Sequence, residues 1–262
     1  MTVWLPVMFR DELDMLRFRL EATQDWDARH VIVESPVTHR GVPKPLWYQE
    51  NATRFALWAD RIEHVVTDLP DVPPWGREHA QRDAAWPVIK EQAANTDTVI
   101  IGDCDEIPSP ALMDWAGPAA VIAVRMRTTL FAVDWEVPPV HLPPQCVAAK
   151  AGWLRMMGSG LAAARDQRGK WPVFEDGGWH FSWIGGPERQ RDKLETATCH
   201  TELLGTIEGD MIRDGTRWRT SEDGGGLPVV PVDVDGSWPA FVRERRCPPE
   251  WFRPREAVPC AH

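Results

Sequence analysis

Apolar and amphipathic segments alternate along the first hundred residues. Apolar, β-branched runs predict strands at four places, namely 2–8, 30–34, 62–66 and 98–102. Helical spacing of apolar positions, as in Leu13, Leu16 and Leu20, predicts helices at 12–23, 50–59 and 75–94. This strand–helix alternation predicts a single α/β domain with a Rossmann-like, mainly parallel sheet flanked by helices.

The pattern is less regular beyond residue 105. The segment 120–133 predicts one or two further strands, and 187–197 and 201–213 predict helices. Residues 224–262 are rich in Gly and Pro, so we expect a main domain over 1–223 and a tail over 224–262 that packs on it.

Composition narrows the class of protein. The 262 residues carry a formal charge of −10, which argues against a phosphate-backbone partner. The five cysteines form no C-x-x-C pair, so we expect no structural zinc site but reduced thiols in a cytoplasmic protein. No apolar run approaches the roughly 18 residues that span a bilayer, and the first residues do not resemble a signal peptide.

Tryptophan is unusually frequent, with 15 residues against a single tyrosine. Core packing explains most of such an excess, whereas some indole faces could bind the apolar faces of sugar rings. The tryptophans close to other candidate site residues are Trp47, Trp75, Trp135 and Trp179.

The strongest motif is T-V-I-I-G-D-C-D-E-I-P at 98–108, where an apolar strand ends in three carboxylates. Ligands of open α/β sheets bind beyond the carboxyl ends of the strands. Asp103 and Asp105 are two residues apart, so both can point to one cation, and oxygen ligands favour Mn²⁺ or Mg²⁺ with a bound diphosphate. The alternative is a solvated acidic turn before a helix at Ser109-Pro110.

A second motif, G-G-W-H-F-S-W-I-G-G at 177–186, contains His180 and is followed by Lys193. The imidazole could complete the metal site, or it could simply be packed among aromatic side chains. Flanking glycines allow a close approach of the backbone to a ligand. Lys193 is a candidate for contact with the donor phosphates.

Two further segments supply candidate residues. In V-F-E-D, Asp176 is the predicted general base, with Glu175 in reserve, unless the pair caps a helix or lies in an exposed turn. The loop after the second strand and the segment 75–82 offer donor-binding candidates, which are Glu34, Arg40, Lys44 and Arg77. Their alternative is a solvated surface loop and helix.

Five blocks together resemble glycosyltransferase family 17, whose best-known members are β-1,4-mannosyl-glycoprotein 4-β-N-acetylglucosaminyltransferases. The blocks are F-R-D-E-L-D-M-L-R-F-R-L (9–20), V-I-V-E-S-P-V-T-H-R-G-V-P-K-P-L (31–46), W-G-R-E-H-A-Q-R (75–82), I-G-D-C-D-E-I-P (101–108) and G-W-H-F-S-W-I-G (178–185). The resemblance implies a GT-A fold, a UDP-sugar donor, inversion at the anomeric carbon and a metal motif formed by Asp103 and Asp105. Animal members carry a membrane anchor, and its absence here suggests a bacterial or phage member.

The sequence therefore predicts a metal-dependent inverting glycosyltransferase that moves GlcNAc or a related hexose from a UDP-sugar to an acceptor hydroxyl. Asp105 is expected to bind the metal, and Asp103 to bind it or to hold the ribose. The acceptor stays open among a glycan, a protein and a modified nucleic acid. Two alternatives are a nucleotidyltransferase that makes an NDP-sugar, although no Gly-rich basic loop is evident, and a non-catalytic sugar-binding protein.

Overall fold

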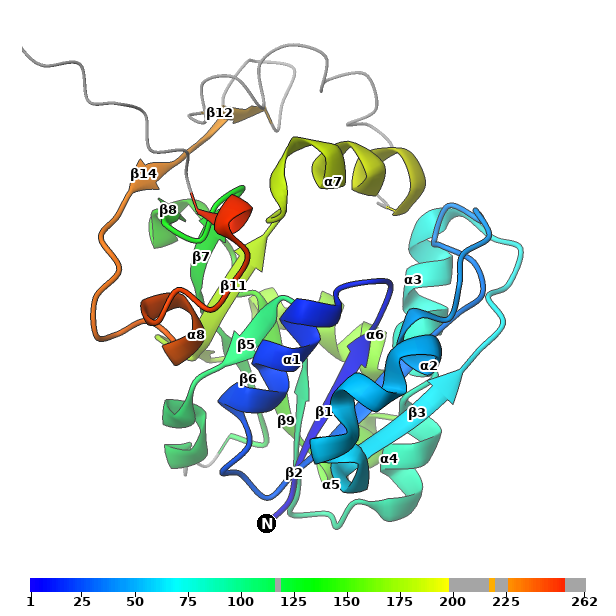
Figure 1. Ribbon diagram of the computed structural model, residues 1–262. Helices are drawn as coiled ribbons and strands as arrows, with labels where there is room; N and C mark the ends of the chain where they lie inside the picture. The colour runs from blue at the N-terminus through cyan, green and yellow to red at the C-terminus, as the bar shows by residue number, and fades with distance from the viewer. Residues whose placement is uncertain (116–118, 198–216, 220–225, 253–262) are drawn as a thin grey trace, which may run out of the picture.

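A seven-stranded sheet forms the centre of the molecule (Figure 1). The computed structural model describes residues 1–115, 119–197, 217–219 and 226–252. The sheet has the order β10-β6-β9-β4-β1-β2-β3. Its strands are β1 (Val3–Met8), β2 (Ala28–Glu34), β3 (Ile62–Val66), β4 (Thr98–Ile101), β6 (Val121–Val124), β9 (Cys146–Lys150) and β10 (Val173–Phe174). β3, β2, β1 and β4 are mutually parallel and β9 is antiparallel to both neighbours, so the predicted Rossmann-like, mainly parallel sheet is confirmed.

Helices cover both faces of this sheet because successive strand side chains point to opposite sides. On one face Val7 and Ile32 pack with Phe18 of α1 (Leu13–Ala22). On the other, Val31 and Val33 pack with helices that follow later in the chain. Those helices are α4 (Trp86–Gln92), α5 (Ala151–Met157) and α6 (Gly160–Asp166), and α3 (Pro74–Asp83) packs beside α6.

Two predicted helices differ in detail. The segment 75–94 forms two helices, α3 and α4, because the chain turns at Ala84 and Ala85 and Pro87 has no N–H to continue the first helix. The predicted helix at 50–59 begins earlier, as α2 (Trp47–Asn51), and continues as a 3₁₀ helix over Ala52–Arg61. The predicted helix at 201–213 lies outside the described residues.

A second, five-stranded sheet extends the fold beyond the end of β4. The sequence predicted only one sheet, so this second sheet was not expected. Its order is β14-β8-β7-β11-β5. The strands are β5 (Glu106–Pro108), β7 (Arg127–Leu130), β8 (Trp135–Val137), β11 (Gly178–Ser182) and β14 (Val230–Pro231). They have two to five residues each, which is too short for a periodic signal in the sequence. A small ribbon joins β12 (Arg217–Arg219) to β13 (Gly226–Pro228).

Part of the C-terminal segment belongs to the core. In α8 (Ala240–Arg243), Phe241 stacks on Phe18 of α1 with ring centroids 4.3 Å apart, and Trp238 is buried beside them. The predicted boundary between 223 and 224 falls in residues that are not described. None of the described helices is long and apolar enough to cross a membrane.

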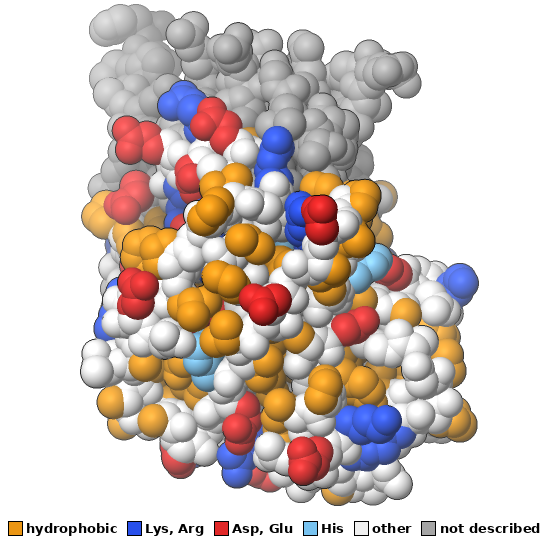
Figure 2. Space-filling view, turned by 90° about the vertical axis from the view of Figure 1, so that its right-hand side faces the viewer, with side chains coloured by type: hydrophobic (Ala, Val, Ile, Leu, Met, Phe, Trp, Pro, Cys, Tyr) orange, Lys and Arg blue, Asp and Glu red, His pale blue; other side chains and the backbone are white. Residues whose placement is uncertain are grey.

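The side of the molecule formed by β3, α2 and α3 is shown in Figure 2. Hydrophobic side chains are spread over it among charged ones. The elements on that side carry exposed Leu57, Val66 and Trp75, and Trp75 also lines a cavity described below.

Candidate active site at the ends of β1 and β4

The strand order places two loops beside each other. From β1 the chain adds β2 and β3 on one side and then returns to place β4 on the other. Such a reversal creates a crevice at the carboxyl ends of the two central strands, where ligands of open α/β sheets bind. The loop after β1 contains Arg10, Asp11 and Glu12, and the loop after β4 contains the D-C-D-E motif.

Asp103 is held by two arginines. Its Oδ1 accepts a hydrogen bond from Arg82 of α3 at 2.9 Å, and its Oδ2 accepts one from Arg165 of α6 at 2.7 Å. Burial alone would raise the pKa of the Asp103 carboxyl, but the two guanidinium groups outweigh it and hold that pKa well below its usual range. Asp103 is therefore a permanently charged anchor of this loop.

Glu106 lies beneath the loop in a bidentate pair. Arg165 donates to both of its carboxylate oxygens at 2.7 Å, and the backbone N–H of Asp103 donates to Oε2 at 3.0 Å. Gly102 makes this possible, because a Cβ there would lie 2.9 Å from Oε2. Burial would raise the pKa of Glu106, but Arg165 lowers it, so the carboxylate stays ionised although only 2% exposed.

The same loop is fixed from below by Arg19 of α1, which is fully buried. Its Nη1 donates to the carbonyl oxygens of Asp103, at 3.1 Å, and of Glu106. The backbone of the D-C-D-E motif is therefore held by α1, and the side chains of Asp103 and Glu106 are held by α3 and α6.

Asp105 differs from its neighbours because no arginine pairs with it among the described residues. Burial raises the pKa of its carboxyl, and the nearby His180 and Lys193 oppose this shift only in part. The closest cationic candidate is His180, whose Nε2 lies 3.9 Å from Oδ1 of Asp105. This is the carboxylate of the motif whose charge is least compensated.

The pairing of β11 with β5 places His180 beside Asp105. His180 is opposite Glu106 in this antiparallel pair, and the N–H of Phe181 donates to the carbonyl oxygen of Asp105 at 2.9 Å. His180 and Ser182 share one face of β11 and line a cavity there. The Nδ1 atom of His180 is buried without a hydrogen-bond partner in the described part of the protein.

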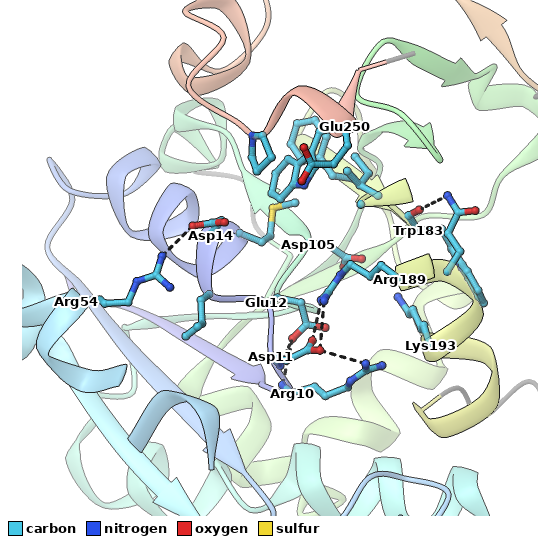
Figure 3. A pocket seen from close by; sticks show the side chains of 18 residues that line it. Arg10, Asp11, Glu12, Asp14, Arg54, Asp105, Trp183, Arg189, Lys193 and Glu250 are labelled. Carbon is cyan, nitrogen blue, oxygen red and sulfur yellow. Dashed lines mark hydrogen bonds and ion pairs between the residues drawn. The ribbon is translucent and has the colours of Figure 1, made fainter. Parts of the chain in front are cut away.

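Two cavities meet at this point. The α3 cavity, of about 270 Å³, extends towards α3 and the loop after β2, and the α1 cavity, of about 290 Å³, extends towards α1 and the C-terminal segment (Figure 3). Five residues line both of them, namely Arg10, Glu12, Asp105, Trp183 and Lys193. The charges in the two cavities are arranged differently.

The α3 cavity contains cations without a carboxylate partner. Among the described residues, Lys44 donates only to the carbonyl oxygens of Arg10 and Pro45, and burial lowers the pKa of its ammonium group. Lys193 has its Nζ 5.2 Å from the ring centroid of Trp183 and forms no ion pair with the described residues. Both lysines are therefore available to an anionic ligand.

In the α1 cavity, by contrast, the arginines are already paired. Arg189 of α7 (Gly186–Asp192) donates to both oxygens of Asp11, at 2.7 and 3.2 Å. Arg54 pairs with Asp14 at 2.9 Å, and Arg10 pairs with Asp11 at 3.1 Å. Figure 3 shows Arg189 and Lys193 on one side of this cavity, the loop after β1 on another and Glu250 above.

Three predicted donor-binding residues lie outside both cavities. Glu34 is fully buried, and its carboxylate accepts the backbone N–H groups of Tyr48 and Gln49 at the start of α2, and Nε2 of His64 at 2.9 Å. Arg40 donates to the carbonyl oxygen of Leu194. Arg77 donates to the carbonyl oxygens of His39 and Pro70 and pairs with Asp71 at 2.9 Å, so it supports the loop that lines the α3 cavity.

The structure does not bring the predicted bases Asp176 and Glu175 to this site. They lie in the turn between β10 and β11, where Asp176 has a left-handed backbone with φ 55°, and neither residue lines either cavity. The side chain of Glu175 is 61% exposed and pairs with Arg125 at 2.9 Å, and the backbone oxygen of Asp176 accepts a hydrogen bond from the Ser109 hydroxyl.

The sequence predicted that the glycines beside Asp176 allow a close approach to a ligand, but they approach other parts of the chain instead. A Cβ at Gly177 would collide with the side chain of Val124, and a Cβ at Gly178 with the carbonyl oxygen of Ile107. These glycines allow β11 to pack closely against β5 and β6, so their role is internal packing.

The three predicted metal ligands, Asp103, Asp105 and His180, do not all point to one position. Within the described residues, no group of three or more His, Cys, Asp or Glu side chains is arranged to hold a metal ion. The physical reason is that Asp103 turns towards Arg82 and Arg165. Asp105 and His180 stay together, and they fit a cation that takes one or two protein ligands and completes its shell with water and phosphate oxygens.

Of the four tryptophans singled out as sugar platforms, only Trp75 lines either cavity. It is 49% exposed at the α3 cavity, whereas Trp135 and Trp179 pack against hydrophobic clusters. Trp47 is half-exposed elsewhere. The cavities contain two other tryptophans instead, Trp183 in both and Trp251 in the α1 cavity.

Sequence reasoning missed several residues of the site. Glu12 lies in the first block of the family resemblance, directly after the first strand, so the rule for strand ends could have identified it. Arg165 carries no local signal, since it comes from a helix 59 positions after Glu106. Trp183 lines both cavities and adopts a left-handed backbone with φ 57°, which is rare for a bulky residue and which the sequence does not signal.

Fold and site together define an α/β enzyme of Rossmann-like strand order whose acidic and cationic side chains gather at the reversal point of the sheet. The chain belongs to glycosyltransferase family 17, because the model of that family matches residues 2–185. This range includes both loops at the sheet edge and His180. It makes the protein a glycosyltransferase, with a sugar donor and an acceptor. No curated protein matches the chain.

Proposed function

We propose that the protein is a metal-dependent inverting glycosyltransferase that uses a UDP-sugar, with GlcNAc or a related hexose as the transferred sugar. The observation that carries this proposal is the α3 cavity. It combines two lysines that have no carboxylate partner among the described residues with the weakly compensated pair of Asp105 and His180. A diphosphate bound to a divalent cation matches both features.

Each residue then has a distinct role. Asp105 and His180 would hold Mn²⁺ or Mg²⁺, which stabilises the negative charge of the departing diphosphate. Lys44 and Lys193 bind the phosphate oxygens from two sides of the cavity, and the exposed indole of Trp75 offers a flat face to the nucleobase. Asp103 positions the loop through Arg82 and Arg165, so its role is indirect.

The direct test is release of UDP from UDP-GlcNAc by the purified protein with Mn²⁺, compared with the same reaction in a chelator. We expect UDP release that depends on the cation. Release of pyrophosphate from UTP and a sugar phosphate would instead indicate a nucleotidyltransferase. A protein that neither binds UDP with Mn²⁺ nor releases it from the sugar would contradict the proposal.

Thermal stability gives an independent readout, since a ligand that binds only the native state raises stability by RT ln(1 + [L]/Kd). UDP should raise the melting temperature more with Mn²⁺ than without it. Lys44→Met should weaken this effect, whereas Arg77→Met, at the back of the same loop, should lower the melting temperature without changing the UDP shift.

A further inference from the structure

The α1 cavity shares a wall with the α3 cavity at Glu12 and Asp105. If the diphosphate occupies the α3 cavity, as the proposed function requires, the anomeric carbon lies at this shared wall. In an inverting reaction the attacking hydroxyl approaches from the side opposite to the leaving group. The α1 cavity is the space on that opposite side.

The charges of the α1 cavity suit a neutral ligand. Its lining contains four cationic side chains and five carboxylates. Arg54 and Arg189 are each neutralised by an aspartate, so they are not free to bind phosphates of a nucleic acid. Trp183 and Trp251 contribute aromatic surface, on which the apolar face of a pyranose packs well.

Elimination identifies one carboxylate as a base. Asp11 uses both oxygens for Arg189, and Asp14 is paired with Arg54. Asp105 is the carboxylate next to the proposed cation. Glu250 lines only the α1 cavity, whereas Glu12 lines both cavities and therefore reaches the shared wall.

Glu12 is also oriented for the task. Its Oε2 accepts the backbone N–H groups of Arg10 and Asp11, both at 3.1 Å, which fixes the side chain at the start of α1. Its Oε1 accepts no hydrogen bond from the described residues. The result is one anchored oxygen and one oxygen that is open to a ligand.

We propose that the α1 cavity binds a neutral saccharide acceptor and that Glu12 is the catalytic base of the transfer. The acceptor oxygen forms a bond to the anomeric carbon while the bond between that carbon and the diphosphate oxygen breaks. The hydroxyl proton passes to Oε1 of Glu12, and the electron pair of the broken bond stays on the departing UDP. This inference rests on the proposed function.

The test uses Glu12→Gln, whose amide oxygen can still accept the two backbone N–H groups while its basicity is lost. UDP release from UDP-GlcNAc with Mn²⁺ is measured with methyl glycosides of mannose, galactose and N-acetylglucosamine as acceptors. We expect turnover to fall on the order of 10²–10⁴-fold, with UDP affinity in calorimetry unchanged. Asp176→Asn and Glu175→Gln are matched controls and should retain wild-type turnover.

Each other outcome has a defined meaning. Near-normal turnover of Glu12→Gln with loss in Asp176→Asn would overturn the role of Glu12 and leave the proposed function intact. If wild-type protein binds UDP and Mn²⁺ but transfers to none of the three glycosides, the neutral saccharide is the wrong acceptor class. If it binds no UDP, the proposed function itself fails.

Glu12→Asp keeps the carboxylate and separates a chemical role from a structural one. We expect it to retain more turnover than Glu12→Gln at a similar melting temperature. Equal losses in both variants, together with equal drops in melting temperature, would show that Glu12 acts only on the fold.

Discussion

The segments that follow β4 and β10 both contain neighbouring acids, yet they differ in every physical respect. After β4 the carboxylates of Asp103 and Glu106 are both paired with Arg165, and Glu106 is buried. After β10, at the edge of the sheet, Glu175 is largely exposed, and within the described residues Asp176 is bound only through its backbone. Neighbouring acids form a site where the strand before them ends at the reversal point of the sheet. The presence of two acids in a segment is not sufficient by itself.

The largest expected effect comes from Asp105, the acid of the D-C-D-E motif that stays available to bind a cation. Asp105→Asn removes the charge and keeps the shape, so we expect transfer from UDP-GlcNAc to fall on the order of 10³–10⁴-fold, equivalent to about 4–5 kcal/mol of transition-state stabilisation. The readout is UDP release at saturating Mn²⁺. Comparable losses in Asp105→Asn and Asp176→Asn would remove the distinction between the two segments.

The second prediction concerns stability, with two matched Glu→Gln variants. Glu106→Gln breaks a buried bidentate pair with Arg165 and should lower the free energy of unfolding by about 3 kcal/mol. Glu175→Gln breaks an exposed pair with Arg125 and should cost at most about 1 kcal/mol. Urea denaturation of both proteins measures the difference. Equal values would contradict the claim that the buried pair of Glu106 and Arg165 stabilises the fold.

A third prediction uses pH to test whether water is excluded from the region beneath the reversal point of the sheet. His30 of β2 is fully buried beside Arg19, and burial followed by the charge of Arg19 lowers its pKa from 6.5 to about 3. In the unfolded chain His30 therefore binds a proton as the pH falls below 6.5, whereas in the folded protein it binds one only near pH 3. The stability from neutral His30 is complete above this window and is lost as the pH falls through it.

At pH 5 this loss amounts to about 2 kcal/mol relative to neutral pH. His30→Gln removes the titrating group and can still bond to Thr23, the present partner of Nε2. The variant should show a flatter dependence of unfolding free energy on pH between 7 and 5, as measured by urea titrations. An unchanged slope would mean that His30 is hydrated and protonated in the native state.

The smallest of these effects belongs to His180. If it completes the cation shell with Asp105, His180→Ala should weaken Mn²⁺ and UDP binding together by about tenfold, or 1.4 kcal/mol. Glu175→Gln, outside both cavities, is the control and should leave both affinities unchanged. A lower melting temperature with normal Mn²⁺ titration would instead identify His180 as a packed side chain.

Local patterns predicted the four parallel strands β1 to β4 because these strands are apolar and separated by helices, whereas β9 and β10 of the same sheet were not predicted. β1 to β4 all appear where the hydrophobic pattern placed them. The second sheet was not predicted, since strands such as β5 and β14 have two or three residues and exist through pairing with distant partners. Tertiary contacts, which no local window records, decide such elements.

The site was predictable only in part, for a related reason. The D-C-D-E motif and His180 carry local signals, and the structure does bring Asp105 and His180 together. Proximity to His180 in the sequence suggested Glu175 and Asp176 as the base, but both lie in the turn before β11 and neither lines either cavity. The two arginines that occupy Asp103 come from helices α3 and α6, so only the folded chain shows that this acid is engaged.

The most direct test of the central claim is a crystal structure of the protein with UDP and Mn²⁺, with the metal located by its anomalous scattering. The account predicts a Mn²⁺ peak at about 2.2 Å from a carboxylate oxygen of Asp105, in contact with His180 and the diphosphate, while Asp103 stays paired with Arg82 and Arg165. UDP bound in the α3 cavity without a cation at Asp105, or a cation bound elsewhere in the protein, would contradict it.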